Sequence, residues 1–309
     1  MASCERYLWT VVQSIEPSKA QKEGAVRSHN NLRELLLLGR FAKRIQTSYL
    51  SGSYARHTAI APLDDVDIIF VIDPNGWAND GLFFPTRPSP RVILDSFASA
   101  IRYRYPTSSV FGQRRSVRLS LYHLDIDVVP AIDIGDNYIE IPDRNAVNWI
   151  KSSPLRHSQV ASKVNHDRAM KFKPLVKLLK YWNSNIPSTA SLKSFAIETM
   201  AVRLFYVVNF TSLEQGLLMF FDFLSQFHGI FGAAKAYRWT SKYGINIHAM
   251  FPDVQDAAGT GSNLLANVEG DRIQKFIQNA VWSRDAMMDA QAGRSPEVAI
   301  VHAVRALKA

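Results

Sequence analysis

The chain has a single cysteine, Cys4, among its 309 residues. A disulfide within these residues is therefore excluded, and so is any zinc site that needs two or more cysteines. No apolar run approaches the roughly 20 residues that a membrane-spanning helix needs. These absences make the cytosol the expected compartment and give no reason to expect a membrane partner.

Internal repeats and low-complexity segments are also lacking. The composition is that of a globular protein long enough for two lobes, with 47% hydrophobic residues, 15 Gly and 14 Pro. Lys and Arg number 36 against 27 Asp and Glu, which gives a net charge of +9. A surplus of this size favours polyanionic ligands, either nucleoside triphosphates or nucleic acid, without deciding between them.

Apolar periodicity predicts an α+β chain. In the first part it indicates helices over 5–15 and from 18 towards 45, a buried strand over 66–72, a helix over 91–105 and a β-hairpin over 116–132. The hairpin is expected to turn near Tyr122 and His123. From about Asn145 onward the helical period dominates, most clearly over 160–182, 192–209, 213–227, 270–291 and 296–307.

Two domains follow from this change of period. Residues 1–155 are expected to form a lobe with a mixed sheet flanked by helices, including the N-terminal helices. Residues 156–309 are expected to form an all-helical lobe, with the boundary near Pro154. A cleft between two such lobes is a natural place for a ligand.

Asp65 and Asp67 stand at the start of the buried strand. Residues i and i+2 of a strand share a face, so these carboxylates project together while Val66 and Ile68 enter the core. Two crowded carboxylates repel each other and are costly without a cation. Mg²⁺ suits them, because it prefers hard oxygen ligands and keeps positions for substrate phosphate.

A third carboxylate comes from the later β-rich segment, in which Asp125 and Asp127 are again spaced i and i+2. Geometry alone does not choose between them. If this segment pairs beside the first strand, three carboxylates meet on one face. Such a set can hold two metal ions about 3.5–4 Å apart, which clamp the attacking and the leaving oxygen of a transferred phosphoryl group.

Gly52 and Ser53 precede the paired aspartates. A glycine lets the backbone approach a phosphate closely, and a hydroxyl with neighbouring N–H groups can hold its oxygens. Taken singly, a Gly-Ser pair is more often a plain turn, and an Asp-x-Asp pair is more often a solvated strand end. The ordered combination of Gly-Ser, Asp-x-Asp and a later strand aspartate is what favours phosphoryl-transfer chemistry.

These motifs resemble those of the DNA-polymerase-β-type nucleotidyltransferases. The strings SGSYARHTAIAPLDDVDIIFVI, LDIDVVPAI, FKPLVKLLKYWN and SLKSFAIE are similar to those of one branch, the bacterial CD-NTases. These relatives of oligoadenylate synthase and cyclic GMP-AMP synthase are found in anti-phage CBASS operons. The resemblance spans residues 16–282 in the expected order.

The resemblance implies roles for particular residues. It places the metal carboxylates, which are also the catalytic residues, on Asp65, Asp67 and Asp127, the last through the string IDVVPA. Nucleotide-binding positions would be Gly52, Ser53, Lys180, Ser194 and Phe195, with Lys180 and Ser194 on the triphosphate and Phe195 stacked on a base. Without the resemblance, Lys180 reads as a solvated helical lysine and Phe195 as a core residue.

The function implied is a nucleotidyltransferase that joins NTPs, ATP or GTP among them, through phosphodiester bonds with release of pyrophosphate. Two Mg²⁺ ions, or Mn²⁺, would be the cofactors, and a cyclic di- or trinucleotide second messenger the product. The alternatives are a tailing or small-molecule nucleotidyltransferase and a non-catalytic nucleic-acid-binding relative. A regulatory protein or RNA activator is a further partner that the sequence leaves open.

A group of arginines precedes the third aspartate and is either a path for RNA or an ordinary solvated face. Its members are Arg102, Arg104, Arg114, Arg115 and Arg118.

Overall fold

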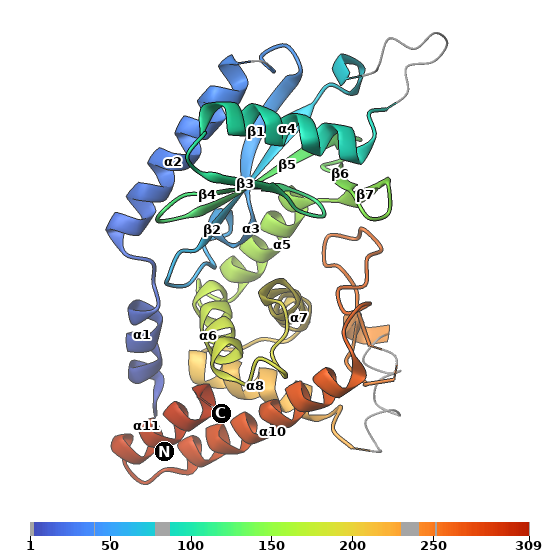
Figure 1. The fold of residues 1–309 in the computed structure, drawn as a ribbon. Helices are drawn as coiled ribbons and strands as arrows, with labels where there is room; N and C mark the ends of the chain where they lie inside the picture. Colours follow the sequence, from blue (N-terminus) through green and yellow to red (C-terminus); the bar gives the residue numbers. More distant parts are fainter. Residues whose placement is uncertain (1–2, 40, 78–86, 230–240, 251, 309) are drawn as a thin grey trace. The chain divides into compact units, whose positions relative to one another are not determined.

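The computed structural model describes residues 3–39, 41–77, 87–229, 241–250 and 252–308 (Figure 1). The chain forms two compact units. Residues 17–158 form one, here called the sheet unit, and residues 1–16 with 159–309 form the other, here called the helical unit. The predicted combination of a helix-flanked sheet and a helical C-terminal part is confirmed.

In the sheet unit, helices alternate with the first two strands, and five consecutive strands follow α4 (Pro90–Arg104). Its helices are α2 (Lys19–Leu38), α3 (Gly52–Ala55), a 3₁₀ turn (Pro74–Trp77) and α4, and α5 (Pro154–Asp167) begins in it. Its strands are β1 (Ile45–Ser51), β2 (Asp65–Ile72), β3 (Ser109–Gly112), β4 (Val117–Ser120), β5 (Asp125–Asp133), β6 (Ile139–Asp143) and β7 (Asn148–Ser152). They form a mixed sheet with the order β1-β2-β5-β4-β3, and β6 joins β5 to β7.

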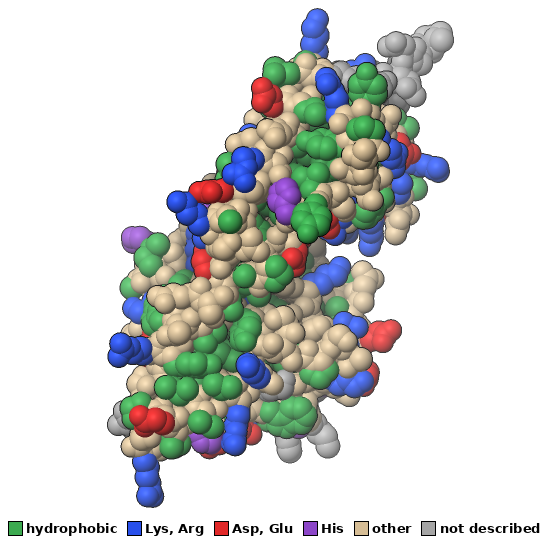
Figure 2. Space-filling model, turned by 60° about the vertical axis from the view of Figure 1, so that its left-hand side comes forward, with side chains coloured by type: hydrophobic (Ala, Val, Ile, Leu, Met, Phe, Trp, Pro, Cys, Tyr) green, Lys and Arg blue, Asp and Glu red, His purple; other side chains and the backbone are tan. Residues whose placement is uncertain are grey.

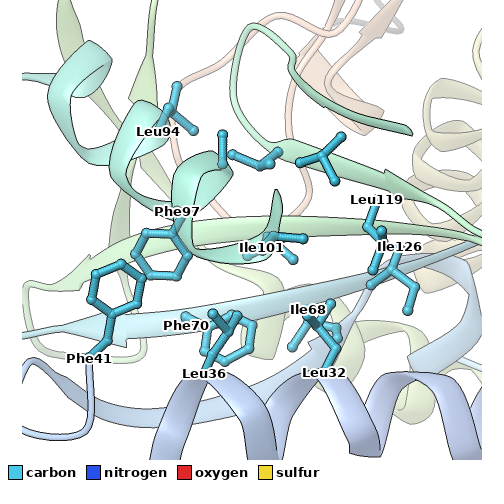
Figure 3. Close-up of a cluster of buried hydrophobic side chains, with 14 of the residues drawn as sticks. Leu32, Leu36, Phe41, Ile68, Phe70, Leu94, Phe97, Ile101, Leu119 and Ile126 are labelled. Carbon is cyan, nitrogen blue, oxygen red and sulfur yellow. The ribbon is translucent and has the colours of Figure 1, made fainter. Parts of the chain in front are cut away.

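The core of this unit lies on the sheet face that α2 and α4 cover (Figure 3). Leu32 and Leu36 of α2 and Phe97 of α4 meet Ile68 and Phe70 of β2. The alternate β2 residues belong to a smaller cluster with β5 on the other face. A strand buried on both faces reads as an unbroken apolar run, which is why the sequence identified β2 readily.

The helical unit contains α1 (Glu5–Ser14), α6 (Phe172–Asn185), α7 (Ser194–Val207), α8 (Leu213–Ser225), α10 (Gly270–Ala292) and α11 (Pro296–Leu307). It also holds the short strand pair β8 (Ile245–Asn246) and β9 (Asp253–Val254). None of the described helices is long and apolar enough to cross a bilayer.

Helix α1 groups with the helical unit, whereas the sequence placed residues 1–16 in the first lobe. The Glu5 carboxylate accepts hydrogen bonds from the backbone N–H groups of Leu213 and Glu214, which begin α8. Glu214 in turn accepts one from the N–H of Cys4. Each carboxylate satisfies N–H groups that a helix start leaves unpaired, and this ties α1 to α8 across about 200 residues of sequence.

Two element boundaries differ from the prediction. The helix expected over 160–182 is divided, because Ala169 and Met170 take left-handed φ values of 47° and 64°. Asn165 stabilises this break, accepting from the N–H of Met170 through its backbone and from that of Lys173 through its side chain. Helix α2 ends at Leu38, so the following residues can enter β1.

The hairpin β6–β7 was not predicted, since its residues read as the start of the helical part. The turn between its strands is formed by Asp143, whose Oδ1 accepts hydrogen bonds from the N–H groups of Asn145 and Ala146. Strand β7 has no fully buried residue, so it carries little of the alternation that marks a strand.

Candidate active site

Strands β2 and β5 are parallel neighbours, and their register brings the predicted aspartates together. Asp65 is paired with Asp125, and Asp67 is paired with Asp127. The intervening Val66 is buried in the core with its β5 partner, so the aspartates share the opposite side of the two strands. The sheet therefore brings a β5 carboxylate beside the first two, as the spacing of the motifs predicted.

Burial and mutual repulsion act on these acids. Burial, followed by the nearby charges of Asp65 and Asp127, raises the pKa of Asp67 to about 7. Burial, and then the charge of Asp127, also raises the pKa of Asp65. Arg56, which is itself buried, and Arg118 act in the opposite direction on Asp67. Such a site gains from a further cation, because the cation offsets both the desolvation and the repulsion.

Gly52 and Ser53 lie next to this row. Ser51 ends β1 and is paired with Asp67 across the β1–β2 ladder, and the short helix α3 begins immediately at Gly52. Gly52 has a left-handed φ of +69°, and a Cβ atom there would lie 1.8 Å from Oδ2 of Asp67. The glycine is required by this close approach of a carboxylate to the backbone, and by the φ value.

Arg118 contacts the candidate site in a way that the sequence analysis missed. Its guanidinium donates to both carboxylate oxygens of Asp127, at 3.0 and 2.6 Å, and to Oδ2 of Asp125 at 3.0 Å. This contact raises the pKa of Arg118. The signal was present: a hairpin that turns between Tyr122 and His123 places Arg118 opposite Asp127.

Three other arginines of the predicted group bond to other partners within the sheet unit. Arg114 and Arg115 both pair with the buried carboxylate of Asp143, at 2.8 and 3.3 Å. Arg102 donates to the carbonyl oxygen of Val110. On the face drawn in Figure 2, Lys and Arg side chains lie at several separate places, and some stand near one another along the right-hand edge of the upper part. The bonds of these arginines within the sheet unit favour the solvated, structural interpretation over a path for RNA.

The predicted contacts of the helical unit lie on α6 and α7. Lys180 is only 4% exposed, and its Nζ lies 2.8 Å from Oε2 of Glu198, which is 3% exposed. Lys180 is therefore not the solvated lysine that its helical position alone suggested. Ser194 is exposed at the first turn of α7, and Phe195 is half-buried.

The donor set of the sheet unit fits a magnesium ion in chemistry, since it offers carboxylate oxygens in a partly buried cluster of surplus negative charge. In the part of the chain that the structure describes, no three His, Cys, Asp or Glu side chains are arranged to hold a metal ion as they stand. The guanidinium of Arg118 takes up both oxygens of Asp127 instead. These residues suit the ion in kind but are not preassembled around it.

Comparisons with known proteins identify the family to which the chain is similar. A family model described as the Second Messenger Oligonucleotide or Dinucleotide Synthetase domain matches residues 2–165. A "Cyclic AMP-AMP-AMP synthase" of an Acinetobacter strain is 29% identical over 281 residues, which cover 87% of this chain and 74% of that protein.

Solved structures share the fold over nearly the whole chain. The structure of Escherichia coli MS115-1 CdnC with ATP has a TM-score of 0.73 at 20% identity, covering 99% of this chain and 98% of that one. The complex of the same CdnC with HORMA-deltaN has a TM-score of 0.72 at 20% identity, covering 99% and 97%. At this identity the likeness concerns the fold.

Proposed function

The chain belongs to the Second Messenger Oligonucleotide or Dinucleotide Synthetase family, nucleotidyltransferases that make nucleotide second messengers, and we propose that its product is a cyclic oligoadenylate. The reaction would join ATP molecules through phosphodiester bonds, close the ring and release pyrophosphate. The observation that carries the chemistry is the row of Asp67 and Asp127 beside Asp65, with Gly52 against it. The choice of adenine, and of a ring of three, is supported by the name of the Acinetobacter relative.

Asp65, Asp67 and Asp127 are the proposed ligands of two Mg²⁺ ions. When bound, these ions would lower the pKa of the acceptor hydroxyl and neutralise the leaving pyrophosphate. Ser53 and the backbone around Gly52 would hold phosphate oxygens, because the glycine has no side chain to cover its backbone beside the Asp67 carboxylate. Asp125 would serve another purpose, as an anchor for Arg118.

Lys180, Ser194 and Phe195 are proposed nucleotide contacts on the strength of the family resemblance. The exposed hydroxyl of Ser194 is accessible to a phosphate. Lys180 would have to share its ammonium between a phosphate and the Glu198 carboxylate. Phe195 is half-buried, which is compatible with one ring face packed on the protein and the other on a base.

A regulatory protein is the proposed partner, because a structure of the same fold was determined as a complex with HORMA-deltaN. The proposal is that this chain binds a protein of that kind. An RNA activator receives less support, since the arginines that would line its path bond within their own unit. We also propose that the protein acts in anti-phage defence and in the cytosol, a proposal that the family supports.

Product analysis tests the function directly. The protein is incubated with radiolabelled ATP, GTP or both, with Mg²⁺ or Mn²⁺, and the products are treated with phosphatase and nucleases. A phosphatase-resistant small product made from ATP alone is expected. Long ladders would identify a tailing polymerase instead, and product made only from GTP would refute the choice of adenine.

The matched variants are Asp127→Asn and Asp64→Asn. Both remove one carboxylate charge from the same region, but Asp64 is exposed. Asp127→Asn is expected to abolish product, and Asp64→Asn to retain it. Equal loss in both variants would contradict the assignment of the site.

A further inference from the structure

Arg118 bonds to two carboxylates at once. Its Nε and Nη2 donate to Oδ1 and Oδ2 of Asp127, at 3.0 and 2.6 Å, and its Nη1 donates to Oδ2 of Asp125 at 3.0 Å. The side chain is 25% exposed. A planar guanidinium that bonds both oxygens of one carboxylate is the strong, oriented form of this ion pair. The side chain of Asp127 is therefore fixed by Arg118 in the described structure.

The sheet itself holds Arg118 in this position. Val117 and Leu119 are fully buried in the core of the sheet unit, so the alternation of β4 directs Arg118 to the opposite face. Antiparallel pairing places Arg118 directly opposite Asp127, and the parallel pairing of β5 with β2 extends this row to Asp67. The contact is set by strand register and not by a flexible loop.

A divalent cation and the Arg118 guanidinium would compete for Asp127. Each oxygen of Asp127 accepts one hydrogen bond from Arg118, which occupies one of its two lone-pair positions and leaves less negative charge available to a metal ion. Like charges within a few ångströms also repel, and the repulsion is strong where water is partly excluded. A nucleoside triphosphate changes this balance, because its phosphate oxygens are further metal ligands and its negative charge offsets that of the guanidinium.

We propose that Arg118 is a positioning residue that serves as a built-in counter-cation. In the protein without nucleotide it holds Asp127 in place and weakens the binding of divalent metal ions. A triphosphate supplies the missing ligands and charge, so metal ions are bound together with the nucleotide and not before it. This inference rests on the proposed function, because it takes Asp127 as a metal ligand.

The test is a titration of the nucleotide-free protein with Mn²⁺. Binding is measured by electron paramagnetic resonance, as the loss of the signal of free Mn²⁺. Arg118→Met and Arg118→Gln remove the charge and are expected to bind Mn²⁺ at least about ten-fold more tightly than the unchanged protein. Arg118→Lys keeps a charge and is expected to lie closer to the unchanged protein. Arg114→Met is the matched control, since Arg114 pairs with Asp143, and it is expected to change nothing.

The outcomes separate this inference from the proposed function. If both neutral variants bind Mn²⁺ with unchanged or weaker affinity while the unchanged protein binds it in the presence of α,β-methylene-ATP, the role of Arg118 is refuted and the metal site stands. The other outcome is that Mn²⁺ binds the unchanged protein with the analogue no more tightly than it binds the analogue alone. In that case the metal ligands assigned under the proposed function are wrong, and the inference is refuted with them.

Discussion

Nζ of Lys180 lies 2.8 Å from Oε2 of Glu198, and the side chains are 4% and 3% exposed. A buried ion pair that loses one partner leaves an uncompensated charge in the interior. Lys180→Ala is therefore expected to lower the free energy of unfolding by about 3–5 kcal/mol, measured by urea denaturation. The exposed pair of Lys163 and Asp167, with exposures of 56% and 37%, gives the control, because water screens this pair and Lys163→Ala should leave the free energy of unfolding nearly unchanged.

The double variant Lys180→Met/Glu198→Leu separates stability from nucleotide binding. It removes both charges and is expected to recover most of the stability that Lys180→Ala loses. If Lys180 also contacts the triphosphate, this stable variant will bind ATP more weakly than the unchanged protein and bind AMP equally well, as measured by calorimetry. Equal loss for ATP and AMP would contradict a contact to the outer phosphates.

Gly52→Ala is expected to reduce activity on the order of 100-fold, because the new methyl group would meet Oδ2 of Asp67 at 1.8 Å and displace a proposed ligand. The left-handed φ adds roughly 1–2 kcal/mol of strain. Gly135→Ala is the matched control, since Gly135 also has a positive φ, +82°, but a Cβ there meets no atom within 4 Å. Equal activities of the two variants would show that the contact with Asp67 is unimportant.

The raised pKa of Asp67, about 7, predicts a pH dependence of the metal-free protein. Between the ordinary value of 3.8 and about 7, the folded state binds a proton at Asp67 that the unfolded state does not. Stability from this group is therefore full below pH 3.8 and is lost as the pH rises towards 7.

Asp67→Asn should remove this decrease of the melting temperature with rising pH, measured across that pH range. It should also raise the melting temperature at pH 8, where the Asp67 charge would otherwise be present. The same variant is expected to lose activity on the order of 1000-fold, since a ligand charge is missing. Asp64→Asn is the control for both measurements. A decrease that persists in Asp67→Asn would assign the titration to another group.

Asp127 and Asp125 differ in what they contact, although they share a face of β5. Asp127 stands in the row of Asp67 and accepts two hydrogen bonds from Arg118, whereas Asp125 accepts one. Asp127→Ala is expected to abolish turnover, and Asp125→Ala to lower it by about ten-fold or less through a looser Arg118. Steady-state rates of pyrophosphate release measure both, and the reverse ranking would exchange the two assignments.

Asp143 holds the pair Arg114 and Arg115, and its side chain is 1% exposed. The pKa of Asp143 is lowered to about 2, because hydrogen bonds from Arg114 and the backbone outweigh its burial. Replacing both arginines by alanine is expected to lower the melting temperature by several degrees, with no change in the affinity for structured RNA. The opposite result would be salt-sensitive RNA binding that is weaker in the double variant but unchanged in Arg104→Ala. It would show that Arg114 and Arg115 line a path for RNA.

The sequence by itself determined the local chemistry of this protein. The apolar run of β2 identified a buried strand, and the i and i+2 spacing of Asp65 and Asp67 placed both on one face, because strand periodicity is a local property. The long helices of the C-terminal part were found for the same reason, since a period of 3.6 is visible within one segment.

Only the tertiary structure decided which segments meet. The pairing of Asp67 with Asp127 depends on the register between β2 and β5, which are parallel strands far apart in the sequence, and the burial of Lys180 beside Glu198 depends on the packing of α6 with α7. The placement of α1 against α8 depends on contacts between residues about 200 positions apart. Such contacts are fixed by packing and by the pairing of buried polar groups across the whole fold, and no local pattern of residues records them.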